Sequence, residues 1–141
     1  MRNVLGFRDA DHQESNPTAG RFAVIALACS LDGRQEEVEV IPGTRAADLY
    51  GRGRVVEPFV CNYGINPEFA TLIEQRGLMV SGRSDDSEVR IVELPEHPFL
   101  VATLFVPQMR STPSNPHPLI EAFVGAARRR AGSGAAHAFF P

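Results

Sequence analysis

The 141-residue sequence has little cysteine, no tryptophan and no long apolar run, and two of these shortages exclude whole classes of protein. Its two cysteines, Cys29 and Cys61, are too few for a disulfide framework, so we expect a protein of the reducing cytoplasm. No apolar stretch reaches the length of a membrane span, and the first residues lack the apolar core of a signal peptide. The missing tryptophan decides nothing.

The charge balance argues against nucleic acid as a partner. The net charge is −3, whereas a protein that binds phosphate backbones needs a basic face. Apolar residues make up 43% and charged residues 22% of the chain, as in an ordinary globular protein rather than a disordered one. A chain of this length is long enough for one domain with a single core.

The most informative stretch begins at His97 and ends at Ile120. An apolar run from Phe99 to Val106 has the length and the β-branched content of a buried strand. A proline-containing loop follows, and residues 116–130 then carry apolar side chains at the spacing of an amphipathic helix. In α/β proteins a loop between a strand and a helix lies at the carboxyl edge of the sheet, where ligands collect.

The same patterns predict the other elements. Asn66 before Pro67 is a helix start, with the proline at the first helical position. Segment 37–41 alternates polar with apolar residues, which suits an edge strand with one wet face. We expect a core that contains Phe22, Val24, Ile25, Phe99, Val101 and Phe105. The remaining predicted elements are a helix end at 1–7, strands at 22–29 and 55–63, short helices at 45–50 and 66–77, and a hairpin of 78–84 with 88–94.

Several of these segments together resemble one family, the glutamine amidotransferase domain of CTP synthase, a class I amidotransferase with a Cys-His-Glu triad. The residues that carry the resemblance are Phe105, Pro107, Ser111-Thr112-Pro113, His117-Pro118-Leu119, Asn66-Pro67-Glu68 and Gly82-Arg83-Ser84. The resemblance implies an α/β fold with a flavodoxin-like, three-layer sheet. It also implies glutamine hydrolysis in pyrimidine nucleotide biosynthesis, with the ammonia passed to a synthase that aminates UTP.

The resemblance covers nearly all of this chain but only about the second half of an amidotransferase domain. The family's Gly-x-Cys-x-Gly nucleophile elbow is not in this sequence. We therefore expect either that the numbering starts at an internal methionine or that a partner supplies the rest. Residues 1–128 are predicted to form the partial domain and residues 129–141 a flexible tail. A partial domain of this kind is expected to expose an apolar edge and to self-associate.

Two positions do not keep the chemistry of the family. The family's catalytic histidine aligns with Val106, and its glutamate aligns with Gln108. A cysteine nucleophile needs an adjacent base that a third group orients, and valine cannot accept a proton. Losing members of such a triad costs several orders of magnitude in rate. We expect a degenerate or truncated amidotransferase domain with little glutamine hydrolysis, so whether the chain is an enzyme stays open.

The second hypothesis is a non-catalytic module that binds a small ligand or a partner in the pocket where the family binds glutamine.

Cys61, Asn62 and Tyr63 are candidate pocket residues, because they fall where the family has its glutamine pocket. The arginines that help to hold the glutamine carboxylate in the family are replaced here, at Pro58, Val60 and Asn62. A bidentate guanidinium is hard to replace in that task. Cys61 itself is either a relocated thiol or a small apolar residue of a strand, since free cysteine is usually buried and inert.

Gln108 and Arg110 are the candidates after the last strand. Gln108 has the donors and acceptors to bind an amide or a base, and Arg110 has the charge to bind an anion. The alternative is an ordinary loop pair exposed to water. We expect no cofactor and no metal, and as partners glutamine or an amide-like molecule and either a second copy of the chain or a synthase.

The other cysteine and the histidines are interpreted as structural. Cys29 lies in an apolar run and is expected to be buried. His12 is a base or a metal ligand only if it has a partner, and no second His or Cys has metal-ligand spacing with it, so a solvated acidic loop is favoured. His97 and His117 each precede a proline, and the resemblance implies turn and helix-start roles for them.

Overall fold

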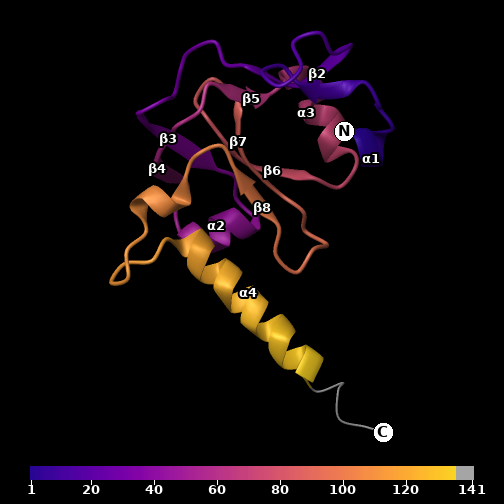
Figure 1. Ribbon diagram of the computed structural model, residues 1–141. Coiled ribbons are helices and arrows are strands. Elements are labelled where there is room, and N and C mark those ends of the chain that lie inside the picture. Colours follow the sequence, from indigo (N-terminus) through magenta and orange to yellow (C-terminus); the bar gives the residue numbers. More distant parts are fainter. Residues whose placement is uncertain (136–141) are drawn as a thin grey trace, which may run out of the picture.

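Two β-sheets organise residues 1–135, the part of the chain that the computed structural model describes (Figure 1). The larger sheet has five strands in the order β4-β3-β6-β7-β8, and all of its pairs are antiparallel. The smaller sheet has the order β1-β2-β5, with β1 parallel and β5 antiparallel to β2. The strands are β1 Ala10–His12, β2 Arg21–Ala26, β3 Gln35–Val40, β4 Arg54–Pro58, β5 Tyr63–Ile65, β6 Met79–Arg83, β7 Val89–Glu93 and β8 Val101–Thr103.

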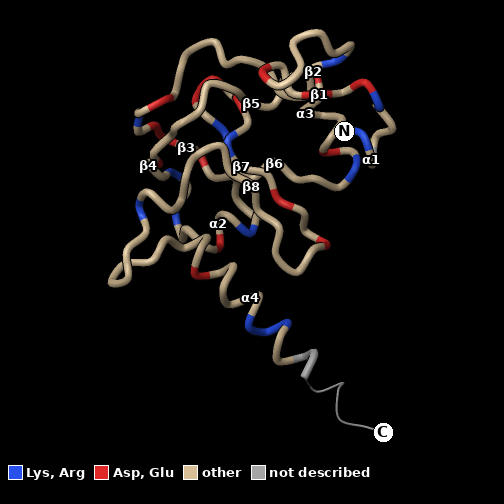
Figure 2. The backbone as a smooth tube through the Cα atoms, viewed as in Figure 1, with Lys and Arg blue, Asp and Glu red and all other residues tan. Residues whose placement is uncertain are grey.

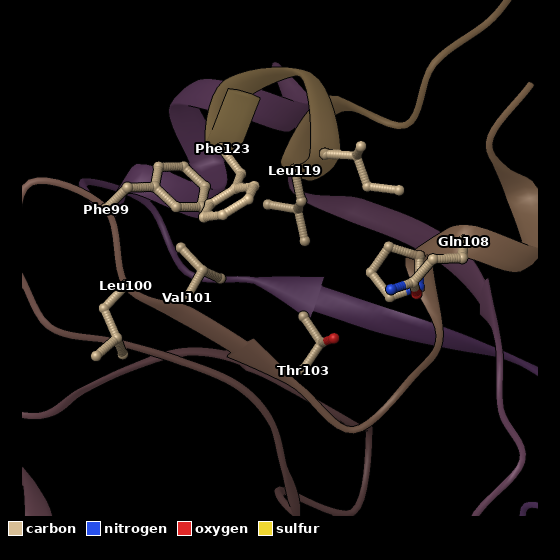
Figure 3. Close-up of a pocket in the computed structure, with 9 residues that line it drawn as sticks. Phe99, Leu100, Val101, Thr103, Gln108, Leu119 and Phe123 are labelled. Carbon is tan, nitrogen blue, oxygen red and sulfur yellow. The ribbon is translucent and has the colours of Figure 1, made fainter. Parts of the chain in front are cut away.

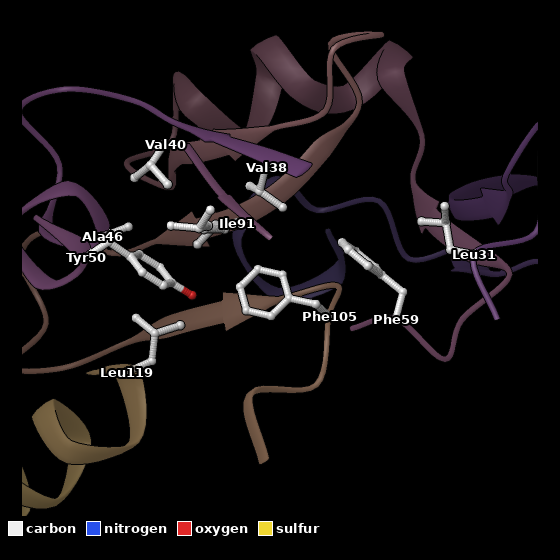
Figure 4. Packing of buried hydrophobic residues seen from close by; sticks show 10 residues of the cluster. Leu31, Val38, Val40, Ala46, Tyr50, Phe59, Ile91, Phe105 and Leu119 are labelled. Carbon is white, nitrogen blue, oxygen red and sulfur yellow. The ribbon is translucent and has the colours of Figure 1, made fainter. Parts of the chain in front are cut away.

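Helices lie on both faces of the larger sheet, which gives the described part of the chain three layers. Ile91 of β7 packs with Val38 of β3 and Leu119 of α4 in the main core, on the face that α2 covers (Figure 4). On the other face, Val80 and Val92 pack against residues of α3 and β5. The helices are α1 Arg2–Leu5, α2 Arg45–Tyr50, η1 Pro67–Phe69, α3 Ala70–Glu74, η2 Pro107–Arg110 and α4 Pro118–Ala135, where η marks a 3₁₀ helix.

The alternating segment forms β3, but β3 is not an edge strand. Val38 and Val40 point into the main core, whereas Glu37 and Glu39 are exposed, as the alternation predicts. β3 pairs with β4 on one side and with β6 on the other, so its prediction as an edge is wrong. An interior strand can keep one wet face when helices cover only its other face, and the alternation does not distinguish the two cases.

The predicted short helix α2 has its start fixed by two side chains. The Thr44 hydroxyl accepts a hydrogen bond from the Ala47 N–H at 3.2 Å and donates to the Ile41 carbonyl. The buried carboxylate of Glu93 on β7 accepts from the N–H groups of Arg45 and Ala46, at 2.9 and 3.1 Å. A negative charge at a helix start complements the helix dipole and its unpaired donors, so β7 and α2 are joined there.

The long apolar run does not form the long buried strand that the sequence predicts. β8 has only three residues, Val101–Thr103, and lies at the edge of the sheet, antiparallel to β7. The Leu104 N–H still bonds to the Arg90 carbonyl, but the Thr103 hydroxyl then donates to the Phe105 carbonyl and the chain turns into η2. The apolar side chains are packed against α4 instead, and a run of this kind does not reveal which partner covers it.

The predicted core is correct for one residue out of six. Phe105 is fully buried, while Phe99 and Val101 are half-buried beside α4. The other three, Phe22, Val24 and Ile25, are half-buried because β2 belongs to the small three-stranded sheet. The predicted strand over 55–63 is also interrupted, since the chain leaves β4 at Pro58 and enters β5 at Tyr63.

Helix α4 continues beyond the point at which we expected a flexible tail. It runs to Ala135, and its distal half points away from the sheets (Figure 1). Alanine and arginine are strong helix formers, and the three glycines of α4 weaken the helix without ending it. The rest of the predicted tail, residues 136–141, lies outside the described residues. Within residues 1–135 no helix is long and apolar enough to cross a bilayer.

Candidate functional site

Val106 and Gln108, the positions to which the resemblance assigns the family's catalytic pair, lie at the start of the turn η2 after β8. Val106 is the residue before the turn, half-buried, and its N–H bonds to the Pro58 carbonyl of β4 at 3.1 Å. Gln108 is exposed and lies at the end of a hollow of about 360 Å³ between β8 and α4 (Figure 3). Phe99, Leu119 and Phe123 line this hollow together with Thr103, so the Gln108 amide borders a lining of mixed polarity.

Arg110, the last residue of η2, pairs with the buried carboxylate of Glu57. Its Nε donates to Glu57 Oε2 at 3.0 Å and its Nη2 to Glu57 Oε1 at 2.5 Å, a bidentate pair. The Glu57 side chain on β4 is completely buried, whereas that of Arg110 is 45% exposed. The bond raises the pKa of Arg110, which stays charged. Arg110 therefore binds an anion, as its charge predicts, but this anion is part of the protein.

Two more buried side chains complete the arrangement around Glu57. The Tyr50 hydroxyl donates to Glu57 Oε1 at 2.9 Å, and burial followed by the Glu57 charge raises the pKa of Tyr50. His117 Nδ1 accepts the Leu119 N–H, so Nε2 carries the proton and donates to Glu57 Oε1 at 3.1 Å. We call Tyr50, Glu57, Arg110 and His117 the Glu57 cluster. His117 thus begins a helix, as predicted, and also joins α4 to β4.

Cys61, Asn62 and Tyr63 line a second hollow, of about 420 Å³, together with His12 and Glu14. The Cys61 thiol donates to the Leu104 carbonyl at 3.4 Å, and burial raises the pKa of this thiol. The His12 ring lies 4.9 Å from the Tyr63 ring, and its Nδ1 accepts the Glu14 N–H. Within residues 1–135 no hydrogen bond joins His12 to Cys61. The Arg90 charge lowers the pKa of this thiol, but burial outweighs that effect, so the thiol is not an activated nucleophile.

The remaining candidates of the sequence are distributed over the surface. Cys29 is exposed, so its prediction as a buried residue is wrong. β2 ends at Ala26, and residues 28–30 bulge outward between two backbone bonds to the segment of Cys61 and Asn62. His97 is an exposed turn residue whose Nδ1 accepts the Phe99 N–H. No group of three or more metal-binding side chains occurs in the described chain.

The five candidate pocket residues therefore do not converge on one point. Cys61, Asn62 and Tyr63 share one hollow, Gln108 lies at another, and Arg110 is paired with Glu57. Sequence reasoning missed Glu57 and Tyr50. A signal for Glu57 was present, because it stands two residues after Val55, at an inward-facing position of an alternating strand.

The fold compares well with two solved structures. The glutaminase domain of Trypanosoma brucei CTPS with bound acivicin has a TM-score of 0.85 and 27% identity, and the match covers 91% of this chain and 54% of that one. A GMP synthase component from Thermoplasma acidophilum has a TM-score of 0.57 at 17% identity, with 79% of this chain and 51% of that one covered, which supports the fold alone. The fold is that of class I glutamine amidotransferases, of which this chain covers about half a domain.

Curated sequence relatives show to which amidotransferase family within this class the chain belongs. The CTP synthase of Nitratidesulfovibrio vulgaris is 35% identical over 154 residues, with 94% of this chain and 28% of that protein covered. That of Pyrobaculum calidifontis is 38% identical over 136 residues, with 89% and 26% covered. No family model matches. The chain is a homologue of the glutamine amidotransferase domain of CTP synthases, and it spans about a quarter of the length of these relatives.

Proposed function

We propose that this chain is the C-terminal part of a CTP-synthase-like amidotransferase domain with little or no ordinary glutamine hydrolysis. The observation that carries the proposal is Val106, which stands where the resemblance places the histidine base. Its aliphatic side chain cannot take a proton from a thiol. Gln108, two residues later on the same turn, is neutral and cannot stabilise an imidazolium as a carboxylate does.

The other imidazoles near the turn and the hollows do not replace the missing base. The His117 side chain is only 1% exposed, and its Nε2 proton is directed to Glu57. His12 faces the same hollow as Cys61, but that thiol donates to a backbone carbonyl and its pKa is raised. A raised pKa keeps the thiol protonated at neutral pH, which opposes nucleophilic attack.

The test is labelling of the complete natural polypeptide by a glutamine analogue that alkylates reactive thiols, followed by mass spectrometry. We expect no adduct on Cys61 or Cys29 at concentrations that saturate an ordinary amidotransferase. The matched variant V106H/Q108E restores both lost groups. If a nucleophile is supplied elsewhere in the polypeptide, the variant gains labelling at that thiol. Rapid glutamine-competed labelling of the unaltered protein would refute the proposal.

The second candidate function is a non-catalytic module that binds a small ligand, and the hollow around Tyr63 favours it. An aromatic pair, an exposed amide at Asn62 and a carboxylate at Glu14 together suit a neutral amide-bearing molecule such as glutamine. The expected result is a glutamine-dependent rise in melting temperature that Asn62→Ala abolishes, without ammonia release. An unchanged melting temperature at millimolar glutamine would remove this candidate.

The relationship to CTP synthases also supports a proposal about the location and the assembly of the protein. We propose a cytoplasmic protein that assembles as a homo-oligomer or with a synthase partner, in which any ammonia produced would aminate UTP. Support comes from the relatives, which are CTP synthases by name. Light scattering after size-exclusion chromatography, with and without a synthase domain, measures both assemblies.

A further inference from the structure

Arg90 is a buried cation that lacks most of its hydrogen-bond partners. It lies on the interior strand β7 with 5% of its surface exposed. Its Nη2 donates to Glu88 Oε2 at 2.6 Å, and its guanidinium carbon lies 5.6 Å from the centre of the Phe59 ring. Its Nε and Nη1 have no partner among the described residues. Unpaired charged donors are costly to bury, so this guanidinium calls for a further acceptor.

Arg90 lines a hollow of about 300 Å³ that is separate from the two hollows described above. The segment of Cys29 and Leu31 forms one wall, and β3 together with the turn between β6 and β7 forms the others. This volume lies at the lower end of the range of small-molecule sites. The lining contains both signs of charge, and the charged members are Arg34, Glu36, Glu37, Asp85, Asp86, Glu88 and Arg90.

Most of the acidic side chains around this hollow already have basic partners. Arg34 pairs with Glu36 at 3.5 Å, and Arg54 pairs with Glu37 and Asp85. Acidic and basic stretches accordingly lie side by side on β3 and β4 (Figure 2). Asp86 forms no ion pair with any described residue, and Glu88, whose side chain is 31% exposed, is the single anion at Arg90 among those residues. The lining of this hollow thus combines Asp86, an exposed carboxylate without an ion pair among the described residues, with Arg90, a buried guanidinium that has one.

We propose that this hollow binds a small zwitterion of the α-amino-acid class. The ligand carboxylate accepts from Nε–H and Nη2–H of Arg90, the fork that guanidinium offers to carboxylates. Glu88 turns toward solvent to admit it, and the ligand ammonium lies between the carboxylates of Glu88 and Asp86. The site uses neither Val106 nor the hollow of Cys61, so it stands whether or not the chain hydrolyses glutamine.

The charge pattern selects a zwitterion over simpler ions. A lone anion would meet Arg90 but would be repelled by the surrounding carboxylates, and a lone cation would be repelled by the buried guanidinium. One molecule that carries both charges about 3 Å apart satisfies both groups, since its carboxylate takes the unpaired Nε–H and the Nη2–H that Glu88 releases, while its ammonium meets the carboxylates. Glycine is the smallest such probe.

The test is isothermal titration of the complete protein with glycine and L-serine, alongside acetate and methylammonium at the same pH. We expect saturable binding of the two amino acids and at least about tenfold weaker binding of the two single ions. Asp86→Asn and Glu88→Gln are expected to weaken glycine binding and to reduce the preference for glycine over acetate. Asp86 is exposed, so Asp86→Asn should fold, whereas Glu88 is the ion-pair partner of the buried Arg90, so circular dichroism checks the folding of Glu88→Gln.

Arg90→Lys keeps the positive charge but removes the paired N–H donors that bind both oxygens of a carboxylate. It is expected to weaken glycine binding at least about tenfold. Arg52→Lys, at an exposed position outside both hollows, serves as the control and should leave binding unchanged. Acetate binding as tight as glycine binding would overturn the proposal. So would an Asp86→Asn variant with unaltered affinity, or no binding to the folded protein with only ordered water at Arg90 in a crystal structure.

Discussion

Single residues of the Glu57 cluster hold the turn that carries Val106 and Gln108. Glu57 belongs to β4, Arg110 to η2 and His117 to the start of α4, so one carboxylate joins three elements. A fully buried carboxylate without partners would be strongly unfavourable, and its partners therefore contribute mainly by preventing that cost.

Replacing Arg110 with alanine is expected to lower the free energy of unfolding by about 2 kcal/mol. The loss is smaller than for a fully buried pair, because 45% of the Arg110 side chain is exposed and water screens the charge. Urea denaturation measures the change. Arg52→Ala, at an exposed position, is the matched control, expected within about 0.5 kcal/mol of the unaltered protein. Equal stability of the two variants would contradict a stabilising role for the pair.

The two cysteines should differ in reactivity. Burial raises the pKa of the Cys61 thiol, so its thiolate forms only at a pH above the ordinary thiol range. Iodoacetamide should therefore label exposed Cys29 first at pH 7.5, and the labelling rate of Cys61 should continue to rise with pH after that of an ordinary thiol levels off. Peptide mass spectrometry over a pH series measures both rates. Faster labelling of Cys61 at neutral pH would mean that this thiol is activated.

At the scale of elements, β6 and β7 approach so closely that a side chain cannot be added between them. A Cβ built at Gly82 would lie 2.6 Å from Ile91 Cγ1. Gly82→Ala is expected to destabilise the protein by about 1–3 kcal/mol, because the fully buried Ile91 must move. Thermal and urea unfolding measure the loss.

A double-mutant cycle separates this contact from other effects of the glycine. Ile91→Ala removes Cγ1 and Cδ1, the two atoms nearest to the added Cβ, so the double variant G82A/I91A should lose less stability than the sum of the two single changes. Strict additivity would show that the close approach of Ile91 is not the cause.

The elements that the sequence predicts well are those with local signals. Asn66 accepts the Glu68 N–H and Pro67 opens η1, as the pattern requires, and the hairpin of β6 and β7 has its predicted bounds within one or two residues. β8 was overestimated because an apolar run is equally satisfied by packing against α4. Burial of Glu57 was indicated by the alternation of β4 and was overlooked, whereas burial of Arg90 was missed because every residue of β7 is buried and no alternation marks it.

At the scale of the whole molecule, α4 exposes an apolar face that the described chain does not cover. Phe123 is 57% exposed, and Val124 on the same helix is also exposed. The three arginines of α4 lie farther along, in its distal half (Figure 2). An apolar face of this kind favours association.

We expect concentration-dependent self-association that Phe123→Ser weakens without loss of fold. Serine removes the exposed ring, whereas the buried Leu119 still fixes α4 to the main core. Sedimentation velocity over a hundredfold range of concentration measures the effect, with circular dichroism as the control for folding. A monomer at all concentrations would contradict the expectation.

We propose an amidotransferase frame in which Val106 and Gln108 replace the proton-transfer pair of the family. The measurement that tests this proposal most directly is the rate of ammonia release from glutamine by the complete natural polypeptide. This rate is compared with that of a CTP synthase under the same conditions. We predict a rate at least about 1,000-fold lower, the cost of losing triad members. A rate within about tenfold of the CTP synthase would contradict the central claim, because it would require a base that Val106 cannot provide.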